Sequence, residues 1–278
     1  MLTPTPASNR RGPALPGRMF GLLGLAGLAI GTMLAASAAA TSPQDAKPAN
    51  AAAAPRTVLV TGANRGLGLE FARQYHEAGW NVIGTAREPG EATDLNALKV
   101  RVEQLDVASP ESVAALADKL KGQPIDLLIN NAGISGGARR LEELKMEDLE
   151  HIMNVNAYGP MRVTQALLPN LRAGTGKTVV SISSGLGSIS QNTRGGNYAY
   201  RQSKASLNMF MRTLAAELKD EGFICIPMSP GWVQTDMGGP NAQLTPEQSI
   251  SGMRKVIDNL KAEDSGKFWN HDGNEVPW

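Results

Sequence analysis

The sequence is poor in the residues that build disulfides and metal sites. Cys225 is the only cysteine, and it lies in the apolar run 223–226. An intrachain disulfide is therefore excluded, and we expect an inert core thiol in place of a nucleophile. The three histidines, His76, His151 and His271, lack the spacing of metal ligands, so we expect surface or capping roles for them and no metal site.

The 278-residue chain also lacks a strong charge of either sign. Its formal net charge is +1, and leaving out the three arginines of the first forty residues, a segment without acid or Lys, makes it −2. No run of Lys and Arg with interleaved aromatic residues occurs, so no nucleic-acid partner is expected. The hydrophobic share of 42% is that of a globular protein, and one domain plus an N-terminal appendage is the simplest organisation.

Residues 1–40 have the composition of an export signal or a membrane anchor. Arg10, Arg11 and Arg18 precede an apolar run over 19–36, and small residues at 36–40 form cleavable sites. An uncleaved run would anchor the chain with the domain facing outward. Residues 41–55, rich in Ala and Pro, are predicted to be a disordered linker. We expect a periplasmic or secreted domain after cleavage, an anchored one without it, and a cytoplasmic one if translation starts downstream.

From residue 56 onward, short β-rich runs alternate with helical patterns. Strands are predicted at 58–61, 81–86, 101–106, 125–130, 177–183, 223–229 and near 267–269, and helices at 67–79, 93–98, 110–121, 144–171, 198–221 and 246–260. This alternation is typical of βαβ units. We therefore expect one α/β domain over 56–278 with a doubly wound parallel sheet of about seven strands, and ligands at the carboxyl ends of the strands.

The run 58–70, VLVTGANRGLGLE, is predicted to be a buried strand, a glycine turn and the start of a helix. The N–H groups of a first helical turn lack intrahelical partners and the helix dipole is positive there, so a pyrophosphate can lie against residues 66–68. Gly62, Gly66 and Gly68 allow positive φ and leave no Cβ in the way of a ligand or the next strand. The spacing G-x-x-x-G-x-G differs from G-x-G-x-x-G, and a tight turn without a ligand is the alternative.

The end of the second predicted strand carries no acid. In NAD sites an Asp or Glu roughly twenty residues after the glycine turn binds the adenosine ribose. Here Ala86 is followed by Arg87, and Arg65 lies in the glycine turn. Two guanidinium groups suit a 2′-phosphate, which favours NADP over NAD. The alternative is a pair of exposed arginines on a loop.

Polar residues also follow the third and fourth predicted strands. Asp106 can accept a hydrogen bond from an adenine amino group, or it can cap the helix that begins near Pro110. The run 130–133, Asn-Asn-Ala-Gly, lets the backbone approach a flat ring, and an Asn there can bridge neighbouring strand ends. The same composition occurs in ordinary turns.

Asn156 precedes a Gly-Pro pair inside an otherwise apolar helical stretch. Pro160 lacks the N–H that would bond to the carbonyl of Asn156, so we expect a kink and a freed carbonyl that can hold a water molecule. A kink that serves packing alone is the alternative.

The fifth predicted strand ends at Ser184, and a Tyr-x-x-x-Lys pair follows in the next helix. Tyr200 and Lys204 lie one helical turn apart on one face. An ammonium beside a phenol stabilises the phenolate, so the pair can give or take a proton near neutrality. No His or Asp is placed to make Ser184 a nucleophile.

Together with the run 230–235, Pro-Gly-Trp-Val-Gln-Thr, these motifs resemble the short-chain dehydrogenase/reductase family from residue 57 to the C-terminus. The runs 198–205 and 230–237 and the ending 266–278 are similar to the branch of sniffer-type carbonyl reductases and bacterial C-factor proteins. The resemblance implies a Rossmann-type fold, NADPH as cofactor and a small-molecule carbonyl or alcohol as substrate. It also implies a mobile lid at 238–244. Family members often pair along the helices that correspond to those around Asn156 and Tyr200, so a homo-oligomer is one expectation, with the oligomeric state left open.

The resemblance further implies four catalytic roles. Tyr200 is the general acid, Lys204 lowers its pKa and holds the nicotinamide ribose, Ser184 hydrogen-bonds the substrate carbonyl, and Asn156 anchors a relay water. The residues predicted to bind the cofactor follow the strand ends: Gly62, Asn64, Arg65, Gly66, Leu67, Gly68, Arg87, Asp106, Val107, Asn131, Ala132, Gly133, Tyr200, Lys204, Pro230, Gly231, Val233 and Thr235.

One spacing departs from the family pattern. Ser184 precedes Tyr200 by sixteen positions, which is longer than usual, and we interpret 191–197 as a lengthened loop. Ser184 is kept as the substrate-binding serine, with Ser188 as the second choice. The main competing hypothesis is a non-enzymatic dinucleotide-binding signalling or scaffold protein of C-factor type. Catalysis is favoured because a scaffold needs none of the four catalytic residues.

Overall fold

A computed structural model describes residues 55–278. The export signal or anchor expected over 1–40, and nearly all of the linker expected over 41–55, lie outside the described residues. Seven parallel strands form one sheet in the order β3-β2-β1-β4-β5-β6-β7. The predicted doubly wound sheet is thereby confirmed.

The elements follow one another in the predicted order. The strands are β1 (Thr57–Val60), β2 (Asn81–Ala86), β3 (Arg101–Gln104), β4 (Leu127–Asn130), β5 (Thr178–Ile182), β6 (Ile224–Ser229) and β7 (Trp269–Asn270). The main helices are α1 (Gly66–Glu77), α2 (Thr93–Ala97), α3 (Pro110–Lys119), α4 (Met146–Met153), α5 (Gly159–Ala166), α6 (Leu168–Ala173), α7 (Tyr198–Glu217) and α8 (Pro246–Ile257).

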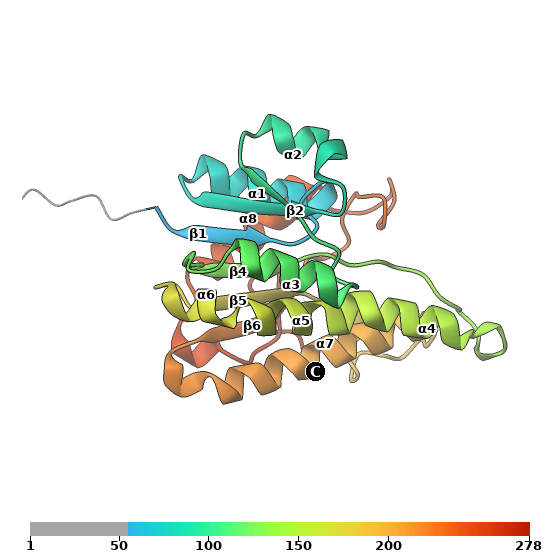
Figure 1. Cartoon of the computed structure of the whole chain (residues 1–278). Helices are drawn as coiled ribbons and strands as arrows, with labels where there is room; N and C mark the ends of the chain where they lie inside the picture. The colour runs from blue at the N-terminus through green and yellow to red at the C-terminus, as the bar shows by residue number, and fades with distance from the viewer. Residues whose placement is uncertain (1–54) are drawn as a thin grey trace, which may run out of the picture. The chain divides into compact units, whose positions relative to one another are not determined.

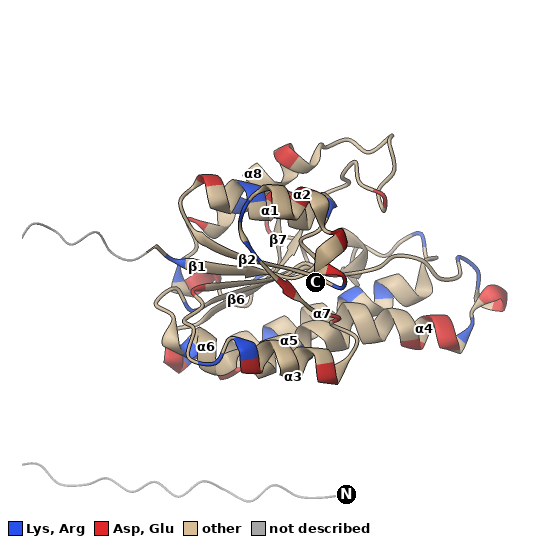
Figure 2. Cartoon of the chain, turned by 45° about the horizontal axis from the view of Figure 1, so that its top comes forward, with Lys and Arg blue, Asp and Glu red and all other residues tan. Residues whose placement is uncertain are grey.

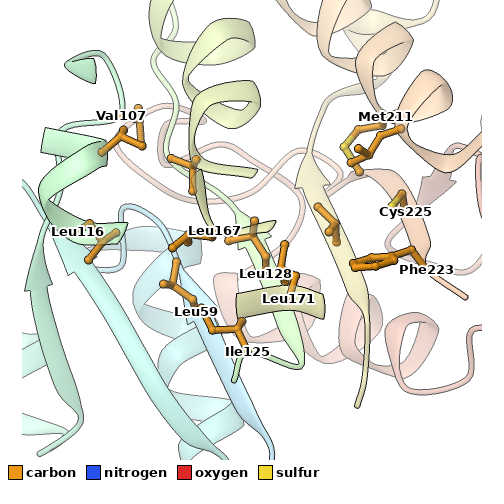
Figure 3. Packing of buried hydrophobic residues seen from close by; sticks show 14 of the residues in the cluster. Leu59, Val107, Leu116, Ile125, Leu128, Leu167, Leu171, Met211, Phe223 and Cys225 are labelled. Atoms are coloured by element: carbon orange, nitrogen blue, oxygen red, sulfur yellow. The ribbon is translucent and has the colours of Figure 1, made fainter. Parts of the chain in front are cut away.

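Both faces of the sheet are covered by helices (Figure 1). Successive strand residues point to opposite faces, so Leu59 and its neighbour Val60 enter different clusters. Leu59 packs with residues of α3, α5 and α7, and Figure 3 shows this cluster around Leu59, Leu128 and Leu167. Val60 packs with residues of α1, α2 and α8. Burial on both faces explains why the central strands are continuous apolar runs.

The direction in which successive strands are added to the sheet reverses between β1 and β4, because the chain runs outward from β1 to β3 and then crosses back to β4 beside β1. β1 pairs with β2 on one side and with β4 on the other. The chain leaves β1 and β4 toward opposite faces, which opens a crevice at their carboxyl ends. The glycine turn after β1 and the residues after β4 both lie at this end of the sheet.

The prediction of a single helix over 144–171 is wrong. The structure divides it into α4, a π-helical turn at Asn154–Tyr158, α5 and α6. Proline stands in the first turn of both α5 and α6. Pro169 begins a new helix after Leu167, whose ψ of 4° leaves the helical path, so its missing N–H costs nothing. Tyr158 and Gly159 keep helical angles, so the chain continues from the π-helical turn into α5, and Pro160 lies directly after that wide turn.

The positions of Lys and Arg are interspersed with those of Asp and Glu along the helices and loops of the described chain (Figure 2). Among residues 55–278 no helix combines the length and the apolarity needed to cross a membrane.

Candidate active site

The glycine turn after β1 is built as the sequence predicts. Gly62 and Gly66 have φ of +63° and +54°, which other residues adopt only with strain. Gly68 has no positive φ, but a Cβ there would lie 2.1 Å from the Gly62 oxygen and 2.6 Å from Asn131 Nδ2. α1 starts at Gly66 and no side chain caps it. The free N–H groups of its first turn and its dipole therefore suit a pyrophosphate.

Residues after β4 hold this turn in place. Asn131 Nδ2 donates to the carbonyls of Thr61 (2.9 Å) and Gly62 (3.0 Å), so it bridges the two strand ends as expected. The Thr61 hydroxyl accepts from the backbone N–H groups of Asn131 (2.9 Å) and Ala132 (3.0 Å). Ala132 in turn leaves no room for a side chain at position 62, because a Cβ added to Gly62 would lie 3.0 Å from the Ala132 Cα.

The segment after β6 closes over the glycine turn from the other side. An added Cβ at Gly66 would lie 3.5 Å from Thr235 Cγ2, and Arg65 pairs with Asp236 at 3.3 Å. Gly231 has φ of +78°, and the Pro230 carbonyl accepts from Ser249 of α8 at 2.7 Å.

Val233 is buried and forms a short parallel bridge with Leu244, which ties the far end of the expected lid 238–244 to the segment that precedes it.

The residues expected around the adenosine differ in their surroundings. Asn64 and Arg87 are exposed at the surface, and Leu67 is half-buried. Arg65 forms an ion pair with Asp236. No contact joins Arg65 to Arg87, the second arginine expected to bind the phosphate. Val107 is buried against Gly159 of α5.

Asp106 does not cap α3. Its carboxylate accepts from the Ala108 N–H at 2.9 Å, and the N-cap of α3 is Ser109, whose hydroxyl accepts from the Ser112 N–H. The alternative of a capping Asp106 is therefore wrong, because the helix begins after Ser109. The adenine role stays a prediction.

Asn156 lies in the π-helical turn with its side chain fully buried. Its Oδ1 accepts from the Ile134 N–H and its Nδ2 donates to the Ile134 carbonyl, both at 2.8 Å. Nδ2 also donates to the Ser203 hydroxyl of α7 at 3.1 Å. The amide thus joins the segment after β4 to the helix that carries Tyr200 and Lys204. π-helical turns of this kind are rare and are frequent at functional sites.

Ser184 follows β5 and starts a short 3-10 turn, Gly185–Gly187. Its hydroxyl accepts from the Leu186 N–H at 3.1 Å, and it lowers the pKa of the Tyr200 phenol. Ser188, the second choice, is buried and donates to the Pro277 carbonyl at 2.6 Å. Of the two serines, Ser184 is the one that meets Tyr200.

Tyr200 and Lys204 stand on one face of α7, with the Lys204 Nζ 5.7 Å from the centre of the Tyr200 ring. Lys204 is buried and donates to the Ile182 carbonyl at 2.8 Å. Burial lowers the pKa of Lys204 to about 8. A Cβ added at Gly133 would lie 3.6 Å from the Lys204 Nζ and 3.2 Å from Asn156 Oδ1. Lys204 and Asn156 therefore both lie next to Gly133.

The expected fall in the pKa of Tyr200 does not appear in this structure. Burial raises the pKa of Tyr200, and a hydrogen bond with Ser184 partly offsets the rise. Lys204 does not contribute to the pKa of Tyr200, and its ammonium donates to the Ile182 carbonyl. In the free protein Ser184, not Lys204, makes the phenol more acidic.

Sequence reasoning missed two neighbours of the site. The Tyr200 hydroxyl lies 3.9 Å from the Met237 sulfur, and Thr61 supports both residues that follow β4. Both lie inside the family motifs quoted above, so motif membership was the available signal. Their side chains alone, a thioether and a hydroxyl, indicate no particular chemistry.

These geometries define a dinucleotide-binding α/β protein. A glycine turn lies at the reversal of strand order, and a serine, a tyrosine and a lysine gather at the carboxyl ends of the neighbouring strands. The model of the family described as short chain dehydrogenase matches residues 56–244, and the chain belongs to this family.

Relatives agree with this assignment. The C-signal protein of Myxococcus xanthus is 48% identical over 164 residues, which cover 59% of this chain and 99% of that protein. The solved structure of the carbonyl reductase Sniffer of D. melanogaster has a TM-score of 0.77 and 30% identity, covering 81% of this chain and 100% of that one. An NADPH-bound carbonyl reductase from chicken fatty liver has a TM-score of 0.74 and 35% identity, covering 81% and 99%. The chain is thus an oxidoreductase of this family by membership and by fold.

Proposed function

We propose that the protein is an NADP-dependent reductase of ketones or aldehydes with Tyr200 as its general acid. The observation that carries the proposal is the gathering of Ser184, Tyr200, Lys204 and Asn156 at the carboxyl ends of β4 and β5. A structural role alone does not require a buried ammonium such as that of Lys204, because burying a charge costs desolvation energy.

NADP is the cofactor that the residues fit. β2 ends at the buried Ala86, so no carboxylate stands where a ribose 2′-hydroxyl is bound in NAD sites. Arg65 and Arg87 are exposed around the glycine turn and the end of β2, and guanidinium groups suit a phosphate. The NADPH-bound carbonyl reductase of similar fold supports the same choice. NAD is the less favoured cofactor.

Each catalytic group has one task. Tyr200 donates its proton to the carbonyl oxygen of the substrate, and Ser184 donates a hydrogen bond to the same oxygen as charge develops there. In the free protein the Lys204 ammonium donates to the Ile182 carbonyl and does not lower the pKa of Tyr200. With the cofactor bound, Lys204 would hold the nicotinamide ribose, and its positive charge would then favour the phenolate left behind. Asn156 fixes the segment after β4 against α7. When bound, the reduced nicotinamide supplies a hydride to the carbonyl carbon, and the product is an alcohol.

The test is NADPH consumption by the purified full chain with a panel of ketones, aldehydes and quinones. Tyr200→Phe should keep its affinity for NADPH and lose at least ~100-fold in kcat, the usual contribution of a general acid. Tyr198→Phe, on the same helix, is the matched control and should keep kcat within about twofold. Full activity in Tyr200→Phe would remove Tyr200 from this role.

The same assay separates the competing function. A non-enzymatic signalling or scaffold protein of C-factor type would bind NADPH and turn over none of the panel. We do not favour it, because the chain keeps the whole catalytic set.

We further propose that residues 1–40 export the domain or anchor it facing outward. Sequencing the N-terminus of the native protein tests this. A start within residues 36–42 supports cleavage, an intact residue 1 in the membrane fraction supports an anchor, and a start downstream in the cytoplasmic fraction contradicts export.

A further inference from the structure

The C-terminal residues 276–278, here called the tail, fold back onto the last strand. Val276 is buried, and its N–H donates to the Phe268 carbonyl at 2.7 Å. The Trp278 ring lies 5.8 Å from the Phe268 ring, and the Arg212 guanidinium of α7 lies 5.8 Å from the Trp278 ring. Aromatic and cation–π contacts of this kind stabilise the position of a ring beyond the burial of its surface. The tail therefore has a fixed place between β7 and α7.

From this place the tail holds the loop that leaves the candidate active site. The Ser188 hydroxyl donates to the Pro277 carbonyl at 2.6 Å, and the Ser190 N–H donates to the Trp278 carbonyl at 2.8 Å. The Ser188 oxygen also accepts from the Gln191 N–H at 3.2 Å. Ser188 is only 2% exposed, so the two bonds of its hydroxyl are partly shielded from water and costly to lose.

Ser188 is joined to Ser184 by a single tight turn. The Gly187 N–H donates to the Ser184 carbonyl at 2.8 Å, and the Ser188 N–H donates to the Gly185 carbonyl at 3.1 Å. α7 supports the near side of this turn, because Asn208 Nδ2 donates to the Gly187 carbonyl at 3.2 Å. The tail supports its far side, and a displacement of Ser188 moves Ser184 with it.

The lengthened loop makes this second support necessary. Residues 189–195 are exposed, and Gly195 and Gly196 have positive φ. A long glycine-containing loop is costly to order and does not by itself fix the serine at its start. A misplacement of ~1 Å can lower a catalytic rate ~100-fold.

We propose that the tail positions the hydroxyl of Ser184 against Tyr200, with Ser188 and Trp278 as positioning residues. The inference rests on the proposed function. The tail belongs to the ending 266–278, which carries part of the family resemblance but contains none of the four catalytic residues and none of the residues predicted to bind the cofactor. The proposal assigns this ending a role.

The experiment compares four variants of the full chain. Ser188→Ala removes the bonds to Pro277 and Gln191, Trp278→Ala removes the aromatic contacts, and Trp278→Phe keeps a ring in place. Ser265→Ala is the control, because Ser265 also bonds to backbone, at Cys225 and Phe223, but away from Ser184. We expect Ser188→Ala and Trp278→Ala to lose about tenfold in kcat with unchanged NADPH affinity, and Trp278→Phe and Ser265→Ala to stay within about twofold of the wild type.

A second measurement needs no turnover. The titration of Tyr200 is followed by phenolate absorbance, as the difference between each protein and its Tyr200→Phe counterpart. Ser184 lowers the pKa of Tyr200, so Ser188→Ala and Trp278→Ala should raise it, whereas a merely structural loss leaves it unchanged. Lys204, whose ammonium lies 5.7 Å from the Tyr200 ring, is present in every protein compared.

The two proposals fail in different ways. A wild type that consumes no NADPH with any carbonyl contradicts the proposed function, and the Tyr200 titration then still decides on the tail. An active wild type whose Ser188→Ala variant keeps both kcat and the Tyr200 titration overturns the tail proposal. If Trp278→Ala does not fold, Ser188→Ala alone decides.

Discussion

The buried ammonium of Lys204 makes the stability of the protein depend on pH in a direction that can be measured. Burial lowers the pKa of Lys204 from 10.5 to about 8. Between these two values the unfolded chain binds more protons than the folded one, so the free energy of unfolding rises with pH. At 1.36 kcal/mol per pKa unit the full rise is about 3 kcal/mol. Below pH ~8 the lysine is charged in both states and its burial costs the full amount.

Urea unfolding of the wild type and of Lys204→Met at several pH values between 7 and 11 tests this. The difference between the two proteins in free energy of unfolding should change by about 3 kcal/mol in favour of the wild type as the pH rises through this range. Lys255→Met is the control, because Lys255 is exposed on α8, and it should follow the wild type. A constant difference between wild type and Lys204→Met would refute the reasoning, because it would mean that the ammonium is not desolvated.

Three further predictions concern the fold and the cofactor site. Asp126 accepts four hydrogen bonds and its pKa is lowered, so Asp126→Asn should lower the free energy of unfolding by about 2–4 kcal/mol at pH 7. This deficit should shrink as the pH falls below ~4, because the carboxylate contribution is present above the unfolded pKa and lost below it; acid and urea titrations check both. Gly68→Ala should weaken NADPH binding at least tenfold in calorimetry, because its Cβ would lie 2.1 Å from the Gly62 oxygen. Asp236→Asn should tighten NADPH binding about two- to fivefold at low salt and leave NADH unchanged, since it frees Arg65 from an exposed ion pair; equal effects on both cofactors would contradict this.

The fold could be predicted from the sequence because its signals are local. The apolar strands, the glycine turn and the helix starts at Pro110 and Pro246 fix the order of the elements, and parallel crossovers then leave one sheet. Several element ends differ from the prediction. β3 ends at Gln104 instead of Asp106, and the stretch 144–171 is divided, because tertiary packing decides where a helix yields to its prolines.

The candidate site was predictable where a residue type carries its own chemistry, as Tyr200 and Lys204 do. The pKa of Tyr200 could not be predicted in this way, because it depends on which group accepts the hydrogen bond of the Lys204 ammonium. The sequence does not show that this group is the Ile182 carbonyl. The ion pair of Arg65 with Asp236 was equally hidden. It joins residues far apart in the chain, and neither residue type indicates its partner.

The π-helical turn at Asn154–Tyr158 also has a consequence for chain length. Such a turn contains one residue more than an α-helical path would, and each residue of an α-helix rotates the next by about 100°. Deleting one residue of this turn would therefore give a regular α-helix without rotating α5, and Val163 and Thr164, both buried, would still face the sheet. A deletion at the start of α5 itself has no extra residue to remove, and it would rotate Val163 and Thr164 by about 100° away from the sheet. The π-helical turn is thus the one place in this stretch where a residue can be lost without changing which side chains are buried.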